Sequence, residues 1–283
     1  MRISLNITNY SWDGDPVDRL VEVARAADRS VIDTVWVNDH LMQAEPGTTP
    51  DEPMLEAYTV LGFLASETRR VRLGTMVTGV TFRPAALLLK AVTTVDVLSR
   101  GRAWLGIGAG YHAEEAEALG LPLPEQRERF GILEETLALA RQMWAGDRTP
   151  FSGTHLRLAD PVASPLPARR PPVLIGGMGE QRTLRLVARY AEACNLFDIP
   201  DGGQTLRHKL GVLRQRCEEV GRDYDTIDKT VSARFDPARS PGEFVAHCRE
   251  LGSYGLTHVV CITTGPWQPE TVDALARAAA ALA

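Results

Sequence analysis

The chain has little that would predict a protein held together by disulfides or by a structural zinc ion. It has four cysteines in 283 residues, at positions 194, 217, 248 and 261, and no two of them form a Cys-x-x-Cys pair. Cysteines this widely spaced in a chain of this length do not predict a disulfide or zinc framework. We therefore expect reduced thiols and a cytoplasmic protein.

A strong excess of charge of one sign is also lacking, because 31 basic residues stand against 36 acidic ones and the net charge is -5. No run of Lys or Arg is available to neutralise a nucleic acid or an anionic membrane. No segment approaches the roughly 20 apolar residues that cross a bilayer, and residues 1–13 lack the pattern of a secretory signal. We expect a small molecule as the partner, with neither nucleic acid nor a membrane.

Two common catalytic motifs are missing as well. The chain has no His-Glu-x-x-His and no Gly-x-Ser-x-Gly, and the triplet His112-Ala113-Glu114 has no Pro-Cys-x-x-Cys partner. The sequence therefore predicts neither a metal site nor a serine hydrolase.

What the chain does have is a regular alternation of strand-type and helix-type segments, which is typical of a parallel sheet. Strands are expected at residues 3–7, 34–37, 71–77, 103–107, 173–175, 194–197, 230–235 and 258–262, with helices at 16–27, 54–66, 84–98, 130–144, 181–191, 206–220, 243–251 and 272–282. Eight such units in 283 residues predict one α/β domain over residues 1–283, a (β/α)8 TIM barrel. An open doubly wound sheet is the alternative, and residues 151–158 are expected to form a hairpin in a connector.

Reactive groups of a barrel of this kind gather on the loops that follow the strands. Asn38, Asp39 and His40 directly follow the strand predicted at 34–37, and His40 is the best candidate for a general acid or base. The alternative is that Asp39 caps a turn and His40 is an exposed loop residue. The histidines at positions 155, 208, 247 and 258 fall in the connector, in helices or at the start of a strand.

Two glycine-rich segments also follow predicted strands. Residues 105–112 could bring backbone amides close to a ligand, although tight packing at the barrel rim explains them equally well. Residues 176–180, followed by Arg182 and Arg185, predict a seat for an anion such as phosphate, with a simple loop as the alternative.

Taken together, these segments resemble the luciferase-like superfamily, and within it the branch that depends on the deazaflavin coenzyme F420. The resemblance runs nearly end to end. It rests on the segments Val35-Trp36-Val37-Asn38-Asp39-His40, Pro53 to Tyr58, Arg72 to Val80, Leu105 to Gly110, Gly176-Gly177 and Thr183 to Ala191.

The resemblance implies a TIM barrel of the bacterial-luciferase type, usually a homodimer. Its cofactor ring rests against a bulge in the third strand, often with a cis peptide bond, at the positions of Met76 and Val77, and Thr78 would also bind the cofactor. His40 would be the catalytic residue near the hydride-carrying carbon. The remaining cofactor-binding residues implied are Asp39, Ala109, Gly110, Gly176, Gly177, Met178 and Gly179. Trp12, Tyr111 and His112 fall on or near the predicted top loops, where they could shape an apolar substrate pocket, although an ordinary packing role explains each of them at least as well.

Two departures limit what can be carried over from the family. Met178 stands where relatives often have glycine, and Tyr111 stands where the sugar-phosphate dehydrogenases of the superfamily carry a catalytic carboxylate. We therefore expect hydride transfer between F420 and a small organic C=C, C=N, C=O or alcohol group rather than a sugar phosphate. The alternatives are an FMN-dependent monooxygenase in the same barrel and a flavin-binding barrel without turnover.

Overall fold

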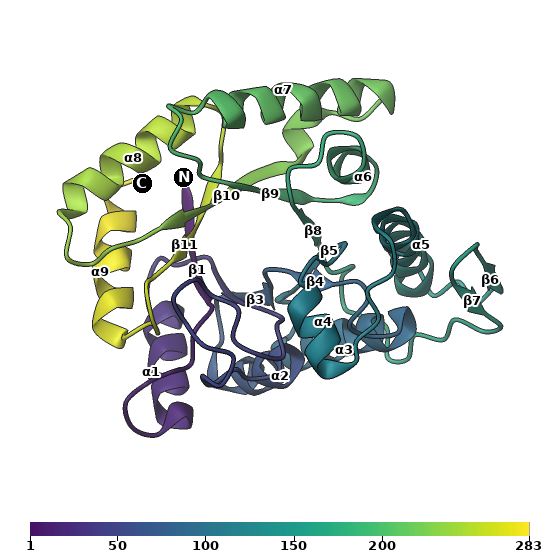
Figure 1. The fold of residues 1–283 in the computed structure, drawn as a ribbon, viewed down its shortest axis with the longest axis horizontal. Helices are drawn as coiled ribbons and strands as arrows, with labels where there is room; N and C mark the ends of the chain where they lie inside the picture. Colours follow the sequence, from purple (N-terminus) through teal and green to yellow (C-terminus); the bar gives the residue numbers. More distant parts are fainter. Residues whose placement is uncertain (283) are drawn as a thin grey trace.

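The alternation seen in the sequence produces a closed ring of parallel strands, with helices around its outer side (Figure 1). The computed structural model describes residues 1–282. The ring is formed by β1 (Arg2–Ile7), β2 (Thr34–Val37), β3 (Arg72–Thr75), β4 (Thr78–Gly79), β5 (Ala103–Gly108), β8 (Val173–Gly176), β9 (Ala193–Phe197), β10 (Asp228–Arg234) and β11 (His258–Ile262).

The ring closes because β3 pairs with β5 as well as with β2, and β1 pairs with β11 as well as with β2. If β3 and β4 are taken as the two halves of one strand, residues 1–282 contain eight parallel strand positions. The predicted (β/α)8 barrel is therefore confirmed, and the open doubly wound sheet is wrong.

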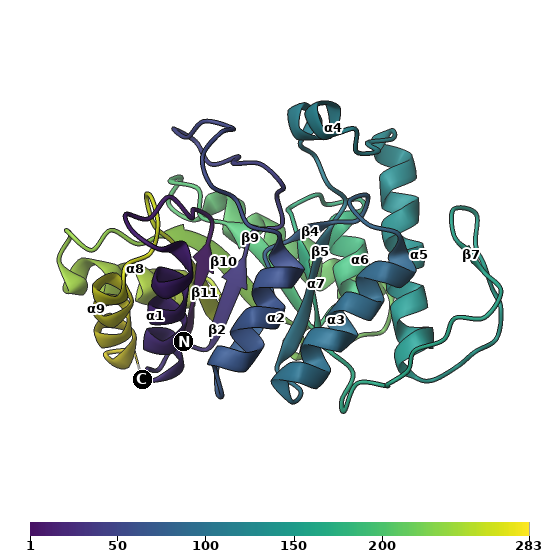
Figure 2. The same cartoon turned by 90° about the horizontal axis from the view of Figure 1, so that it is seen from below.

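The helices follow the strands in the predicted order. They are α1 (Pro16–Asp28), α2 (Ala57–Glu67), α3 (Ala85–Ser99), α4 (Ala113–Leu119), α5 (Gln126–Trp144), α6 (Thr183–Tyr190), α7 (Gln204–Glu219), α8 (Pro241–Ser253) and α9 (Pro269–Ala280). The first helix is capped as predicted, since the side chain of Asp15 accepts a hydrogen bond from the Val17 amide and Pro16 begins the helix. Figure 2 shows α4 and the loop after β2 projecting from the same end of the barrel.

Two differences from the prediction bear on the site. Helix α2 begins at Ala57 instead of residue 54, because the Glu56 carboxylate caps it by accepting a hydrogen bond from the Thr59 amide. The third strand, predicted as continuous, is interrupted between β3 and β4 by a cis peptide bond that joins Met76 to Val77.

The short helix α4 was not predicted at all. Its seven residues are too few to show a helical repeat of apolar side chains. It begins where His112 Nδ1 accepts a hydrogen bond from the Glu115 amide, and it ends at Gly120 with a left-handed φ of 64°.

Side chains that point into the barrel fill its lower half, which contains the N-terminal ends of the strands. Trp36, Trp104, Leu174, Ala193 and Val260 form this inner cluster. The alternate residues of each strand point outward and join the larger apolar core beneath the helices. The inner cluster leaves the upper half of the barrel free for polar side chains and a cavity.

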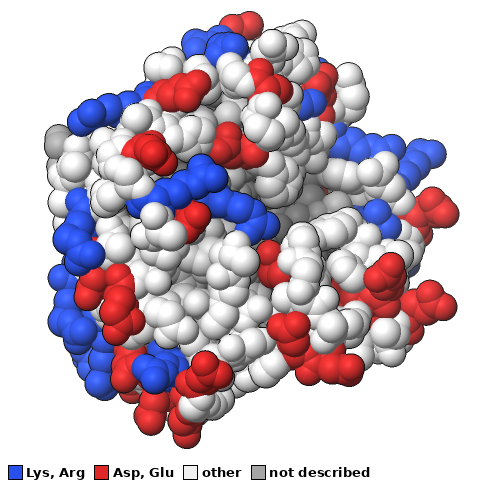
Figure 3. All heavy atoms as spheres, turned by 60° about the vertical axis from the view of Figure 1, so that its left-hand side comes forward, with Lys and Arg blue, Asp and Glu red and all other residues white. Residues whose placement is uncertain are grey.

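Segments outside the ring are peripheral. The predicted hairpin in the connector is confirmed by the antiparallel pair β6 (Phe151–Ser152) and β7 (Arg157–Leu158), which lies away from the barrel (Figure 2). Among the described helices, none is both long and apolar enough to cross a membrane. Figure 3 shows acidic and basic side chains interspersed over one face of the molecule.

Candidate active site

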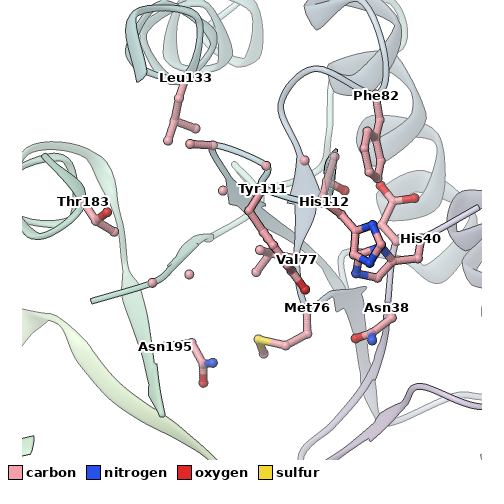
Figure 4. A pocket seen from close by; sticks show the side chains of 18 of the residues that line it. Asn38, His40, Met76, Val77, Phe82, Tyr111, His112, Leu133, Thr183 and Asn195 are labelled. Atoms are coloured by element: carbon pink, nitrogen blue, oxygen red, sulfur yellow. The ribbon is translucent and has the colours of Figure 1, made fainter. Parts of the chain in front are cut away.

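A cavity of about 400 Å³ opens at the C-terminal ends of the strands. Most of the residues predicted to form the site line it, and Figure 4 shows several of them pointing toward one another. The lining includes Asp39, His40, Met76, Val77, Thr78, Ala109, Gly110, Tyr111, His112, Gly176 and Gly177. Segments that are far apart in sequence, from 38–40 to 176–177, therefore meet at one place.

The break between β3 and β4 forms one wall of this cavity. The side chain of Val77 lies between two glycines, because a Cβ atom added at Gly108 or at Gly176 would come within 3.1 Å of its methyl carbons. Larger residues at either glycine would push against Val77. The two glycines thus leave a smooth apolar bulge that faces open space, which is the shape a flat ring system can rest on.

A chain of buried hydroxyl groups holds this bulge from behind. Tyr58 Oη lies 2.8 Å from Thr78 Oγ1, which donates to Thr75 Oγ1 at 3.1 Å, and Thr75 Oγ1 donates to the Gly106 carbonyl oxygen at 2.7 Å. A Cβ atom at Gly106 would lie 1.7 Å from the carbonyl oxygen of Thr75. Glycine is therefore required at position 106 for β3 to approach β5 this closely.

His40 lies at the rim of the cavity and is held by a buried carboxylate. Its Nδ1 is 2.7 Å from Glu115 Oε2, and the other carboxylate oxygen accepts a hydrogen bond from the Leu41 amide at 2.5 Å. The side chain of Glu115 is 0% exposed. Burial by itself raises the pKa of Glu115, but the hydrogen bonds from His40 and Leu41 outweigh it and hold that pKa below its ordinary value.

The consequence for His40 follows from the two nitrogens of its ring. An ionised carboxylate can only accept, so Nδ1 carries the proton that is donated to Glu115. The other nitrogen, Nε2, is left to exchange a proton with a ligand. A histidine held in this way can act as a general base or acid.

Aromatic rings surround His40 on the cavity side. The ring centroids of Phe82, Tyr111 and His112 lie 6.4, 6.1 and 5.5 Å from that of His40, all in edge-on arrangements. Figure 4 shows Phe82 and His112 beside His40. This end of the cavity is therefore shaped for an apolar or aromatic group.

Asp39 is fixed by an ion pair beneath the cavity. Both of its oxygens accept hydrogen bonds from Arg83, at 2.6 and 2.9 Å, and the same guanidinium pairs with Glu56. Arg83 also lies over the ring of Tyr58, 4.7 Å from its centroid. Glu56 and the ring of Tyr58 thus fix the position of Arg83, and Arg83 fixes the orientation of the Asp39 carboxylate.

Polar side chains line the floor of the cavity. Asn6, Asn38, Asn195 and Ser232 contribute to it, and Oδ1 of Asn6 is buried without a hydrogen-bond partner among the described residues. The Glu45 carboxyl also lines the cavity, and burial raises its pKa above the usual value. Such groups supply a ligand with hydrogen-bonding partners in a site otherwise walled by apolar side chains.

The glycine segment after β8 behaves only partly as predicted. Gly176 and Gly177 line the cavity together with Thr183, and Gly177 has a left-handed φ of 112°. Met178 and Gly179 are not part of the lining. Met178 turns back toward the protein, because its sulfur accepts a hydrogen bond from the Phe197 amide at 3.5 Å.

The two arginines predicted to accompany this glycine segment do not line the cavity either. Neither Arg182 nor Arg185 lines the cavity, and Arg182 instead lies over the ring of Phe130 at 5.5 Å. Arg129 of α5 lines the cavity in their place, and its Nε is buried without a hydrogen-bond partner among the described residues. Its Nη1 donates to the Pro124 carbonyl oxygen at 2.8 Å, so Nε is the part of the guanidinium that is available to an anionic group of a ligand.

Trp12 was predicted in the substrate pocket, and the structure places it elsewhere. It is 8% exposed, and its indole Nε1 donates to the carbonyl oxygen of Trp267 at 2.6 Å. Trp267 in turn donates to the carbonyl oxygen of Asn6 at 2.8 Å. The indole group of Trp12 thus finds its partner in the core, so its ring does not face the cavity.

Other histidines lie apart from the cavity lining, as expected. His258 lies at the lower end of the barrel, where Nε2 is 2.5 Å from Ser4 Oγ and burial lowers its pKa to about 4. His247 and His208 pair with Asp198 and Glu180 respectively. Within residues 1–282, no group of three His, Cys, Asp or Glu side chains is arranged to hold a metal ion.

Sequence reasoning missed Glu115, Glu45 and Arg129. None of the three follows a strand directly, and position relative to a strand was the signal used. No sequence signal singles out Glu115, because the helix α4 that carries it is too short to show a repeat of apolar side chains.

A comparison with protein families matches residues 2–280 to the family described as luciferase-like monooxygenase. The chain is 31% identical over 246 residues to an F420-dependent glucose-6-phosphate dehydrogenase of Kineococcus radiotolerans, covering 84% of this chain and 70% of that protein. It is 29% identical over 215 residues to an F420-dependent hydroxymycolic acid dehydrogenase of Mycobacterium tuberculosis, covering 75% of this chain and 57% of that protein. The chain thus spans less than two thirds of the length of some of these relatives.

Solved structures with this fold include enzymes of both cofactor types. An F420-dependent secondary alcohol dehydrogenase in complex with an F420-acetone adduct superposes with a TM-score of 0.85 at 16% identity, covering 100% of this chain and 99% of that one. The monooxygenase RslO1 from Streptomyces bottropensis superposes with a TM-score of 0.80 at 19% identity, covering 99% and 97%. At these identities the likeness concerns the fold alone.

Proposed function

Because the chain belongs to the luciferase-like monooxygenase family, in the branch that includes F420-dependent dehydrogenases, we propose that it is an F420-dependent oxidoreductase acting on a small, uncharged organic molecule. The observation that carries this proposal is His40, held by the buried Glu115 at the mouth of a cavity walled by the Val77 bulge.

The residues of the cavity fit a deazaflavin. The bulge at Val77, set between Gly108 and Gly176, supplies a support for a flat ring, and the unpartnered Oδ1 of Asn6 is an acceptor near it. Gly177 and Thr183 would hold the phosphate of the cofactor tail, with Arg129 as a nearby cation. Asp39, Met76, Thr78, Ala109 and Gly110 complete the contacts, whereas Met178 and Gly179 would act from outside the lining.

When bound, a deazaflavin would supply the chemistry of hydride transfer. His40 moves the accompanying proton through Nε2, giving it to the substrate oxygen, nitrogen or carbon in reduction and taking it from an alcohol in oxidation. Glu115 keeps the proton on Nδ1 and thereby fixes the orientation of the ring. Phe82, Tyr111 and His112 would flank the substrate beside His40.

The lining beside His40 supports an uncharged substrate. Phe82, Tyr111 and His112 offer apolar surface there, and the Glu45 carboxyl would repel an anion when it is ionised. Burial raises the pKa of Glu45, so this carboxyl ionises at a higher pH than an exposed glutamate does.

A paired titration of the purified protein with oxidised F420 and with FMN tests the cofactor assignment. We expect micromolar binding and thermal stabilisation with F420, and much weaker binding with FMN. Preference for FMN, together with oxygen uptake and incorporation of labelled oxygen from O2, would instead establish the monooxygenase alternative. Tight binding of either ring without any redox change across a panel of ketones, enones, imines and alcohols would establish the non-catalytic barrel.

We also propose that the protein is a homodimer. The exposed face of α3 carries Leu87 and Leu98, which are 56% and 58% exposed, and Phe63 of the neighbouring helix α2 is 36% exposed. An apolar face of this kind fits a second copy of the chain.

Sedimentation tests the dimer and should give twice the chain mass of 31.0 kDa. Leu98→Glu should give the monomer, whereas Val162→Glu, in the connector, should not. A monomeric wild-type protein at micromolar concentration would refute the dimer.

Two further assignments accompany this function. We propose one domain over residues 1–283, supported by the pairing of β1 with β11 and the packing of α1 on α9, which join the two ends of the described chain. We propose a cytoplasmic location, supported by the four unpaired, buried cysteines.

A further inference from the structure

A second cavity, of about 370 Å³, lies on the outer side of the barrel. It is bounded by α7, by the short 3-10 helix η1 (Tyr224–Thr226), by the start of β10 and by the segment that follows α8. Lys229, at the N-terminal end of β10, lines this cavity, whereas His40 lies at the C-terminal ends of the strands. The cavity is therefore at the other end of the barrel from His40. Its lining consists of Arg207, Leu210, Gly211, Arg214, Tyr224, Asp225, Lys229, Tyr254 and Gly255.

Three cations converge on this cavity, which we name the α7 cleft. Arg207 lies over the ring of Tyr254 at 4.6 Å, and Arg214 and Lys229 lie over that of Tyr224 at 4.3 and 4.4 Å. Stacking uses the flat face of a guanidinium and leaves the N–H groups at its edge free to donate. The tyrosine rings therefore position the two arginines. Arg207 also donates from Nη2 to the Gly202 carbonyl oxygen at 3.0 Å, and its other N–H groups, like those of Arg214, can donate to a ligand.

Lys229 is the buried member of the group. Its side chain is only 6% exposed. The nearest oxygen partners of its Nζ are the Tyr224 carbonyl at 3.5 Å and Asp225 Oδ1 at 3.8 Å. Both distances exceed the range of about 2.7–3.2 Å for an ordinary hydrogen bond. The Lys229 ammonium is thus stabilised only by long contacts to the carbonyl oxygen and the ring of Tyr224, and a closer oxygen acceptor from a ligand would stabilise it further.

The α7 cleft also has open space beside these cations. A Cβ atom added at Gly211 or at Gly255 would meet no heavy atom within 4 Å. Gly211 lies within α7, where a side chain would be better for the helix than glycine. The absence of a side chain at Gly211 keeps the cleft accessible beside Arg207 and Arg214.

We propose that the α7 cleft binds a dianionic phosphate group, either inorganic phosphate or the phosphate of a monoester. Three cations and the single carboxylate of Asp225 leave two net positive charges in the lining. A phosphate monoester carries a charge of about -1.5 to -2 near neutral pH. Its oxygens can accept from both guanidinium edges and from Lys229 at once, which a monovalent anion with a single acceptor cannot do.

Calorimetric titration of the full chain with sodium phosphate, against sodium chloride of equal ionic strength, tests this site. We expect saturable binding that weakens by about tenfold or more in Arg214→Gln, the loss expected when a charge-assisted hydrogen bond is removed. Gly211→Leu, which fills the α7 cleft without removing a charge, should abolish it. Asp225→Asn removes the opposing carboxylate and should strengthen it. Phenyl phosphate as a second probe distinguishes a monoester site, which it would fill more tightly, from one for inorganic phosphate.

The matched control is Arg277→Gln, which removes an exposed arginine of α9 and should leave the phosphate affinity unchanged. Arg214, Gly211 and Asp225 are all exposed, so these variants are expected to fold, and thermal unfolding checks this. Phosphate binding with the same affinity in all the cleft variants would assign it to the glycine loop beside Gly177 and overturn the proposal. An absence of saturable binding would overturn it as well.

Discussion

Replacing His40 by alanine should lower turnover by about 100- to 10,000-fold, the usual contribution of a general acid or base. The affinity for F420 should change little, because in the proposed arrangement the Val77 bulge, and not the imidazole, would support the ring of the cofactor. Steady-state kinetics with a ketone or alcohol substrate and a fluorescence titration with F420 measure the two quantities. His208→Ala, an exposed histidine of α7, is the matched control. Unchanged turnover in His40→Ala would remove His40 from the mechanism.

A substitution at Glu115 tests the role of His40 independently, because Glu115 would act in the reaction through its contact with the His40 ring. Glu115→Gln keeps the size of the side chain and removes the charge that holds the proton on Nδ1. We expect turnover to fall by at least about tenfold with little change in substrate KM, as when an orienting carboxylate of a histidine is lost. Glu115→Asp, which retains the charge, should recover part of the activity.

The pH dependence of this pair has a defined sign. The folded pKa of Glu115 is lowered, so its contribution to stability is present above the pKa of an unfolded glutamate and is lost as the pH falls through the folded value. The acid limb of unfolding should therefore become shallower in Glu115→Gln. If Glu115→Gln lost turnover only because less of the protein was folded, and Glu115→Asp recovered no activity, Glu115 would only support the fold.

Replacing Gly106 by alanine should have the largest effect on the cofactor site. The new Cβ atom would lie 1.7 Å from the Thr75 carbonyl oxygen, so β3 must move away from β5. Forcing a methyl group into packed backbone costs about 1–3 kcal/mol of stability. The movement should also shift Thr75 and, through it, the Val77 bulge. We expect a lower midpoint of denaturation and loss of measurable F420 binding.

Gly62→Ala is the control for this prediction. Gly62 lies within α2, and a Cβ atom there would meet no heavy atom within 4 Å. Alanine at that position should be neutral or slightly stabilising, because alanine favours a helix more than glycine does. If Gly106→Ala bound F420 as tightly as Gly62→Ala, the close approach of β3 to β5 would not be what shapes the ring support.

The order of strands and helices could be predicted because it depends on local pattern. The apolar run at 34–37 is one such local pattern, and the helix cap formed by Asp15 and Pro16 is another. Both depend only on residues that are close together in the chain. The same patterns placed His40, Gly110 and Gly177 directly after strands, and the ends of parallel strands in one barrel must meet. The boundary of α2 was missed because its cap, Glu56, is not a typical capping residue.

Local patterns in the chain are thus enough to predict the barrel and the segments that meet at its mouth. Which side chains share the cavity depends on contacts between segments that are far apart in the chain. Trp12 is in the core because Trp267, 255 residues away, accepts its hydrogen bond. Glu115 reaches His40 across 75 residues from a helix too short to leave a pattern. Contacts of this kind depend on the packing of distant segments, and no local preference of Trp12 or Glu115 encodes them.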